Sequence, residues 1–174
     1  MRHIISILLQ NEAGALARVS NMFSSRGYNI ESLNVAPTND PIVSRVTLVT
    51  SGSEDIIEQI IKQLSKLIDV VNIINMTDGQ YIERELAMIK LSSKNYNEEN
   101  LLKLVSDYKE SVGILLDLKI IDNSEKYLTV QIVGGSEDIE KTINYLSKST
   151  DVLSVIRSGS MAIAKGKPIL FFSS

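Results

Sequence analysis

The sequence contains no cysteine and no tryptophan, and its only histidine is His3. Without cysteine the chain has no disulfide, no thiol nucleophile and no thiolate ligand for a metal. A metal site needs several ligands and a Ser-His-Asp triad needs a positioned imidazole base, so one histidine supports neither. We therefore interpret His3 as an ordinary strand residue, and we predict no catalytic residue and no metal site on this chain.

Long hydrophobic runs and concentrated positive charge are also missing. The apolar stretch near the N-terminus, residues 4–9, is far shorter than the roughly 18 to 20 residues of a membrane helix, and no small-residue cleavage site follows it. The 18 Lys and Arg residues are scattered, and the net charge is −3 with a pI near 5.3. These features argue against a membrane or nucleic-acid partner, and we expect a cytoplasmic protein.

Glycine and aromatic residues are too dispersed for two further functions. Gly134, Gly135 and Gly159 lie in predicted loops without the spacing of a dinucleotide-binding or Walker motif, which argues against nucleotide binding. RNA-binding sheets of this type stack bases on aromatic side chains, and the predicted strands at 2–9 and 43–50 contain none.

The sequence does contain a regular alternation of short β-branched runs and amphipathic stretches, and 44% of its residues are hydrophobic. Residues 1–76 have the order β-α-β-β-α-β. We predict strands at 2–9, 28–35, 43–50 and 69–76, and helices at 14–26 and 53–68. The Pro37–Pro41 segment is predicted as a turn because proline cannot donate a hydrogen bond to a sheet. With right-handed crossovers, this order predicts a ferredoxin-like antiparallel sheet with both helices on one face.

The same pattern begins again after a polar break at Thr77–Gln80. Residues 84–91 align with residues 2–9 at an offset of 82, and Gly52–Ile56 recurs as Gly135–Ile139. With one gap, the stretches around this motif agree at 12 of 18 aligned positions, which indicates an internal repeat. The second copy is predicted to have strands at 84–91, 111–118, 127–133 and 151–157, a helix at 97–109 and another helix beginning at the repeated motif.

The predicted fold class is therefore α+β, with two ferredoxin-like βαββαβ modules in tandem. We place the first module at residues 1–78, the second at residues 79–164 and a tail at residues 165–174. Residues 160–164 are expected to form a short edge strand. The apolar part of the tail, with its Phe171–Phe172 pair, is expected either to dock or to stay mobile.

The loop Asn11–Gly14 joins the first strand to the first helix and is the main candidate for a binding site. First-turn helix amides have no intrahelical partner and lie at the positive end of the helix dipole, so they can hold a carboxylate. Gly14 leaves room for a ligand near the backbone. Asn29 adds a side-chain amide that can donate and accept hydrogen bonds. The alternative is structural, since Asn and Gly are also common in caps and turns.

The repeat provides an internal comparison for this candidate site. At the offset of 82, the counterparts are Ser93 for Asn11, Tyr96 for Gly14 and Ser111 for Asn29. Residues required by the fold alone would be expected in both copies, so the difference favours a specialised role for the first copy. Ordinary divergence of loops is the alternative explanation.

Several segments, taken in order, resemble one protein family. They are Met1–His3, Asn11–Val19, Phe23–Leu33, Pro37–Pro41, Lys62–Leu64, Lys66–Val70 and Glu83–Leu86. Over about residues 1–164 the sequence resembles the regulatory small subunit of acetolactate synthase, also called acetohydroxyacid synthase. One departure is Ala13, where many relatives have proline, which loosens the loop but keeps its amides.

This resemblance implies an N-terminal ACT domain, a related ACT-like C-terminal domain, and no cofactor on this chain. It implies a large catalytic subunit as partner, with thiamine diphosphate, Mg and FAD. That subunit condenses pyruvate with pyruvate or 2-oxobutyrate on the way to valine, leucine and isoleucine. The small subunit is expected to activate this transferase and to confer feedback inhibition by valine.

The resemblance also implies a homodimer in which ACT domains pair edge to edge, with valine between the two chains. The implied valine site combines Asn11, Gly14, Ala15 and Leu16 of one chain with Asn29 and Ile30 of the other. Two other functions remain open from the residues alone. A free-standing amino-acid sensor would serve a different client protein, and a small enzyme would act on pyruvate without a partner.

Overall fold

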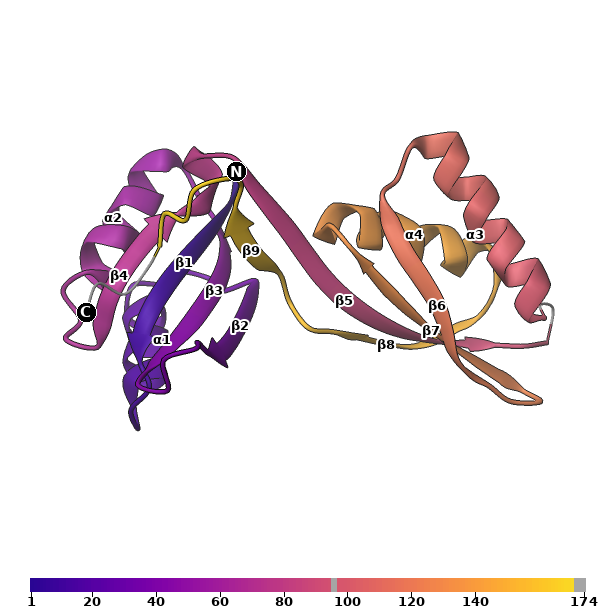
Figure 1. Cartoon of the computed structure of the whole chain (residues 1–174), viewed down its shortest axis with the longest axis horizontal. Coiled ribbons are helices and arrows are strands. Elements are labelled where there is room, and N and C mark those ends of the chain that lie inside the picture. The colour runs from indigo at the N-terminus through magenta and orange to yellow at the C-terminus, as the bar shows by residue number, and fades with distance from the viewer. Residues whose placement is uncertain (95–96, 171–174) are drawn as a thin grey trace. The chain divides into compact units, whose positions relative to one another are not determined.

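The computed structural model describes residues 1–94 and 97–170, and the chain forms two compact units. The first unit comprises residues 1–82 together with the C-terminal segment from Ser160, and the second comprises residues 83–159. The elements, shown in Figure 1, are β1 (Arg2–Gln10), α1 (Ala15–Ser25), β2 (Ser32–Pro37), β3 (Val43–Ser51), α2 (Glu54–Leu64), β4 (Val70–Asn75), η1 (Met76–Asp78), β5 (Tyr81–Ser92), α3 (Glu98–Val112), β6 (Leu116–Asn123), β7 (Tyr127–Gly134), α4 (Ser136–Ser149), β8 (Val152–Arg157) and β9 (Met161–Ala164).

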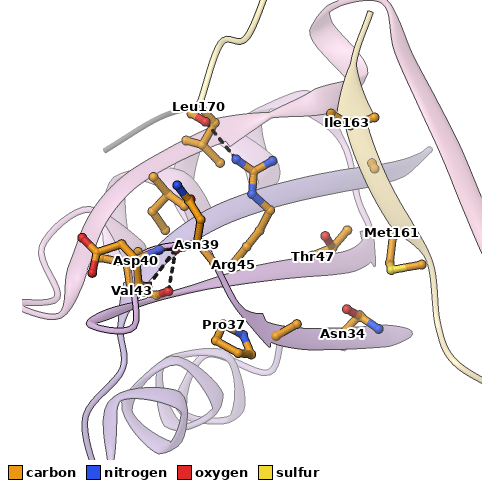
Figure 2. A pocket seen from close by; sticks show the side chains of 14 residues that line it. Asn34, Pro37, Asn39, Asp40, Val43, Arg45, Thr47, Met161, Ile163 and Leu170 are labelled. Carbon is orange, nitrogen blue, oxygen red and sulfur yellow. Dashed lines mark hydrogen bonds between the residues drawn. The ribbon is translucent and has the colours of Figure 1, made fainter. Parts of the chain in front are cut away.

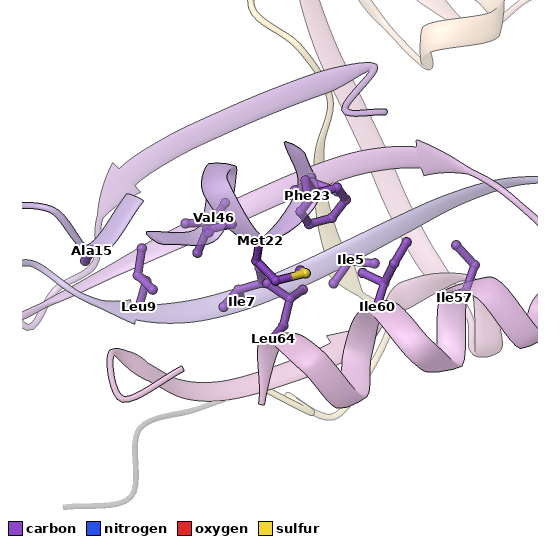
Figure 3. Close-up of a cluster of buried hydrophobic side chains, with 12 residues drawn as sticks. Ile5, Ile7, Leu9, Ala15, Met22, Phe23, Val46, Ile57, Ile60 and Leu64 are labelled. Atoms are coloured by element: carbon purple, nitrogen blue, oxygen red, sulfur yellow. The ribbon is translucent and has the colours of Figure 1, made fainter. Parts of the chain in front are cut away.

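The first unit contains an antiparallel sheet in the order β2-β3-β1-β4, in which β2 and β4 are the edges. Alternate residues of β1 point to opposite faces, as a pleated strand requires. One face packs on α1 and α2, with Phe23 and Ile60 fully buried between the layers (Figure 3). The shared apolar cluster consists of Ile5, Ile7, Leu9, Ala15, Val19, Met22, Phe23, Val46, Leu48, Ile57, Ile60 and Leu64.

The opposite face of this sheet is covered by the C-terminal segment. Ala162 of β9 packs with Ile4 and Val49, and Leu170 packs with Leu8 and Val43. The short strand predicted at 160–164 is confirmed as β9, which pairs with β5, and the apolar part of the described tail is docked. Phe171 and Phe172 lie outside the described residues.

Because the C-terminal segment packs on the first unit, the division of the chain differs from the predicted one. The predicted second domain, 79–164, and the predicted tail, 165–174, share a segment that begins at Ser160 and packs with the first unit. Its apolar residues bury a sheet face that would otherwise be exposed, and local sequence patterns do not reveal such a long-range contact. The backbone N–H of Lys165 also donates to the carbonyl of Gln80 at 2.9 Å.

The second unit repeats the arrangement with its own core. Its strand order is β6-β7-β5-β8, and α3 and α4 contribute Leu101, Val105, Ile139 and Leu146 to the buried cluster. The predicted fold class, two ferredoxin-like modules in tandem, is thus confirmed. In the part of the chain that is described, no helix is both long and apolar enough to cross a membrane.

Two predicted strands were wrong in position. The strand expected at 28–35 is β2 at Ser32–Pro37, because Tyr28 and Ile30 pack on the apolar cluster before the ladder begins. The strand expected at 111–118 is β6 at Leu116–Asn123, because α3 continues to Val112. Ser53 occupies the predicted N-cap position of α2, but its side chain makes no capping hydrogen bond.

Candidate functional site

The loop between β1 and α1 is held against the β2–β3 turn by two hydrogen bonds from one residue. The backbone N–H of Asn11 donates to the carbonyl of Ile42 at 2.8 Å, and its Nδ2 donates to the carbonyl of Pro41 at 3.0 Å. Asn11 itself is exposed. The side chain that we predicted as a ligand group therefore fixes the loop, as the structural alternative expects, and its binding role stays a prediction.

Gly14 is the N-cap residue of α1 and has the left-handed backbone conformation, with φ of 86°. An L-residue is strained in that region, and a Cβ atom on Gly14 would lie 3.2 Å from Nη1 of Arg18. Gly14 offers no side chain to cap the helix. No side chain of a described residue therefore caps the amides of Leu16 and Ala17 in the first turn.

Ala15 and Leu16 face different surroundings at the start of α1. Ala15 is buried in the apolar cluster, and its N–H donates to the carbonyl of Glu12 at 3.2 Å. Leu16 is exposed on the helix surface. Leu16 can therefore contact a ligand or a second chain with its side chain, whereas Ala15 contributes mainly by positioning the backbone.

Asn29 and Ile30 lie between α1 and β2 rather than within the predicted strand. The carbonyl of Asn29 accepts a hydrogen bond from the hydroxyl of Thr50 at 2.6 Å, and its side chain is exposed. Ile30 is half-buried against the helix-side cluster. The backbone of Asn29 is thus anchored while its amide group faces solvent.

The structure does not bring the two groups of candidate residues together within one chain. Asn29 is bonded to Thr50, which pairs with His3 at the beginning of β1, whereas Asn11 follows Gln10 at the other end. Seven residue steps of an extended strand separate these ends by about 24 Å. A single site that uses both groups therefore requires a second chain.

Arg18 and Asp69 form a bidentate ion pair next to this loop, and sequence reasoning missed it. Arg18 donates through Nε and Nη2 to the carboxylate of Asp69, with Nη2 at 2.7 Å from Oδ1. The hydrogen bonds from Arg18 lower the pKa of Asp69 below its ordinary value, against the opposing effect of burial. The only sequence signal was the position of Arg18 in the first turns of α1, close to Gly14.

The register of the two sheets corrects the internal comparison. Arg2 pairs with Ser51 in the first sheet, and Glu85 pairs with Gly134 in the second. Ser51 and Gly134 both precede the repeated Gly-Ser-Glu-Asp-Ile motif directly, so the first strands match at an offset of 83 rather than 82. Gly27 and Gly113 both follow the first helix of their module in the left-handed conformation, so they are equivalent positions. The offset between them is larger than 83, so it increases again after the first helices.

The corrected counterparts sharpen the contrast between the modules. They are Lys94 for Asn11, Asn97 for Gly14 and Leu115 for Asn29, whereas Tyr96 lies outside the described residues. Asn97 is the N-cap of α3, and its side-chain oxygen accepts a hydrogen bond from the N–H of Asn100 at 2.8 Å. The second module fills with a side chain the position that Gly14 leaves open, which agrees with a ligand site in the first module only.

Comparisons with known proteins identify both modules. Residues 5–72 match the family model described as AHAS small subunit-like ACT domain, and residues 84–166 match the model described as small subunit of acetolactate synthase. The first module is therefore an ACT domain.

Full-length relatives give the family. The chain is 39% identical over 170 residues to the acetolactate synthase isozyme 3 small subunit of Salmonella typhimurium, covering 98% of this chain and 99% of that one. It is 37% identical to the acetolactate synthase small subunit of Haemophilus influenzae, covering 96% and 98%. The crystal structure of the small subunit from Thermotoga maritima matches with a TM-score of 0.80 and 30% identity, covering 96% and 99%. The chain belongs to the acetolactate synthase small subunit family.

Proposed function

We propose that this chain is the regulatory subunit of an acetolactate synthase, that it activates a thiamine diphosphate-dependent catalytic subunit, and that it confers feedback inhibition by valine. The family membership supports the partnership, and thiamine diphosphate, Mg and FAD are proposed for the catalytic subunit only. The chemistry of condensation then takes place on the partner, and this chain acts by binding and conformational coupling.

The separation of the two candidate groups within one chain supports a dimeric effector site most strongly. β2 is an edge strand of the first sheet, so it is available to pair with β2 of a second chain. Antiparallel pairing about a two-fold axis places opposite ends of the two sheets side by side. The Asn29 end of one chain then lies beside the Gly14 end of the other, and a complete site forms twice.

Each residue has a distinct role in this proposed site. The uncapped first-turn amides after Gly14 and the helix dipole attract the carboxylate of valine. The side-chain amide of Asn29 from the second chain provides a hydrogen-bond acceptor for the ammonium group. Leu16 and Ile30 supply apolar surface for the isopropyl group. A ligand this small makes few contacts, so enclosure between two chains uses all of its surface.

Inhibition follows if valine favours one geometry of the ACT dimer and that geometry activates the catalytic subunit less. A coupling free energy of about 1 to 3 kcal/mol is sufficient for such control. By linkage, the catalytic subunit in its active state must weaken valine binding by the same factor.

The test uses the enzyme reconstituted from both subunits, assayed with and without valine. We expect Asn29→Ala and Gly14→Asp to weaken valine inhibition while activation stays largely intact. Gly14→Asp adds a negative charge where the carboxylate binds and a Cβ atom where the backbone is left-handed. Unchanged inhibition in both variants rejects the site.

Co-purification distinguishes this proposal from a free-standing amino-acid sensor. The tagged chain should retain a thiamine diphosphate enzyme from its own cell extract. Recovery of a different client protein in its place contradicts the proposed partnership, and turnover of pyruvate by the isolated chain contradicts the regulatory assignment.

A further inference from the structure

A second pocket lies on the helix-free face of the first sheet, between β2, β3 and the C-terminal segment (Figure 2). Its volume is about 660 Å³, which is within the range of small-molecule pockets. Most of its wall is apolar and is formed by Leu8, Pro37, Val43, Met161, Ile163 and Leu170. None of the six residues proposed for the valine site lines it, so it is a separate feature of the same unit.

Arg45 is the positively charged group of this pocket. Its Nη2 donates to the carbonyl of Leu170 at 2.8 Å, which carries the guanidinium over the pocket from β3 (Figure 2). Arg45 is half-buried, and burial lowers the pKa of its guanidinium from the ordinary value. A guanidinium removed from water is costly unless an anion accepts its remaining hydrogen bonds.

Two other arginines bind buried carboxylates, and they show what Arg45 lacks. Arg18 binds Asp69, and Arg157 binds Glu85, in each case through two hydrogen bonds. Across residues 1–94 and 97–170, no carboxylate lies within ion-pairing distance of Arg45. Within these residues its hydrogen-bond partner is the neutral carbonyl of Leu170, so the pocket contains a cation with unused donors.

The strand register places further polar groups beside this cation. Arg45 lies opposite Ala36 in β2, and both residues line the pocket. Two residues further along β3, the hydroxyl-bearing side chain of Thr47 lies opposite Asn34 and lines the same pocket. The pocket therefore has an apolar side and a polar side, and among the described residues Arg45 is its one positively charged lining residue. The lining also contains the carboxylate of Asp40, whose Oδ1 already accepts a hydrogen bond from the backbone N–H of Ile42 at 3.0 Å.

We propose that this pocket binds a small aliphatic carboxylate, with its carboxylate on Arg45 and its hydrocarbon chain against Leu8, Met161 and Leu170. A single cation matches a monoanion better than a phosphate, which carries more charge and needs more donors. The apolar wall selects a hydrocarbon body. Because Arg45 belongs to β3 and Leu170 to the C-terminal segment, the bound ligand fastens that segment to the sheet.

The experiment uses the full chain with 13C-methyl-labelled methionine and follows the Met161 signal, assigned with Met161→Leu. The probe is 4-methylpentanoate, and its neutral analogue 4-methylpentanamide is the comparison. We expect a saturable shift of the Met161 signal with the acid, and an affinity weaker by about tenfold or more with the amide or in Arg45→Gln, because a charge-assisted hydrogen bond is lost.

Two further variants separate the pocket from general effects. Ala36→Leu keeps the charge but adds a larger side chain to the pocket wall, and we expect it to abolish probe binding. Arg26→Gln removes an exposed guanidinium of the same unit, bonded to Gln63, and should bind the probe like the native chain. Thermal unfolding of each variant reports whether it is folded.

Three results overturn the proposal. They are no saturable Met161 shift in the native chain, equal affinity for the acid and the amide, and unchanged affinity in Arg45→Gln and Ala36→Leu. Failure of valine inhibition to respond to Asn29→Ala leaves this pocket unaffected, so the two proposals are tested independently.

Discussion

The guanidinium of Arg18 binds the carboxylate of Asp69 through two hydrogen bonds, and the Asp69 side chain is only 3% exposed. This pair joins the first turns of α1 to the residue that precedes β4. The third guanidinium nitrogen, Nη1, lies where a side chain on Gly14 would have to fit. The loop proposed to bind valine is therefore rigidly supported on one side by an ion pair.

We expect Arg18→Gln to lower the free energy of unfolding at neutral pH. We also expect this free energy to fall less than in the native chain as the pH is made acidic. The pKa of Asp69 is lowered in the folded state, so its contribution to stability is complete above the pKa of the unfolded chain and is lost as the pH falls through the folded value. Urea unfolding at neutral and acidic pH measures both effects.

The matched control for this variant is Lys62→Gln. Lys62 pairs with Glu58 on the surface of α2, where the two side chains are 70% and 69% exposed. Surface pairs of this kind contribute little, so stability should barely change. An Arg18→Gln chain with native stability and native pH dependence of stability would show that the Arg18–Asp69 ion pair does not stabilise the fold.

The second module contains its own buried ion pair, between Glu85 of β5 and Arg157 of β8. Burial alone would raise the pKa of Glu85, but the hydrogen bonds and charge of Arg157 outweigh it and hold the pKa below the ordinary value. Breaking a buried pair typically costs about 3 to 5 kcal/mol. We expect about 2 kcal/mol for Glu85→Gln because Arg157 is 32% exposed and keeps a second partner in Glu140.

Urea unfolding of Glu85→Gln tests this value, with Glu137→Gln as control. Glu137 bonds Lys141 one turn away on α4 and is 82% exposed, so its replacement should have little effect. Because the folded pKa of Glu85 is lowered, the difference between native and Glu85→Gln chains should shrink as the pH falls through that pKa. A constant difference across pH contradicts the ionised pair.

The edge strand β2 provides a test of dimer formation. We expect Val35→Asp to shift the chain from dimer to monomer, because the two-fold axis would bring like charges close together at a paired edge. Val71→Asp is the matched control, since Val71 lies on the other edge strand, β4, and is 39% exposed against 40% for Val35. Sedimentation equilibrium measures the mass.

The comparison of the two edges is decisive for the proposed dimer. Valine binding should be lost in Val35→Asp and kept in Val71→Asp. A dimer that survives Val35→Asp but dissociates in Val71→Asp would show that β4, not β2, forms the contact.

Docking of the C-terminal segment is tested by Leu170→Ala. Leu170 is 5% exposed and packs on Leu8 and Val43, so truncation should cost about 2 to 3 kcal/mol of unfolding free energy. Ile169→Ala is the control, because Ile169 is 43% exposed and its replacement should cost under about 1 kcal/mol. Equal effects of the two changes would mean that Leu170 is not docked in solution.

The elements that could be predicted from the sequence are those defined by local periodicity and punctuation. β1 has a short β-branched run, α1 has an apolar stripe, and Gly27 follows the helix in the left-handed conformation. The second strand of each module was misplaced for a different reason. In the first module Ile30 is apolar because it packs on the buried cluster, and in the second module the residues after Lys109 continue α3 to Val112. Gly113 was the available signal, since it repeats the role of Gly27.

The candidate site was predictable only in part. The sequence indicated room for a ligand at Gly14 and a side-chain amide at Asn29, but a sequence pattern gives no distance between them. The left-handed backbone of Gly14 and the exposure of Asn29 come from the structure. The long-range contacts of Asp69 with Arg18 and of Leu170 with Arg45 were missed, because side chains 51 and 125 residues apart leave no local pattern.

The most direct measurement is valine titration calorimetry on a mixed dimer, made by co-expressing a Gly14→Asp chain and an Asn29→Ala chain with different tags. Each variant alone should bind no valine. If the loop of one chain faces Asn29 of the other, the mixed dimer has one site with both defects and one intact site, because an isologous interface repeats each contact twice. We predict that valine binding returns at about half the native number of sites. Continued absence of binding in the mixed dimer would contradict a site shared between two chains.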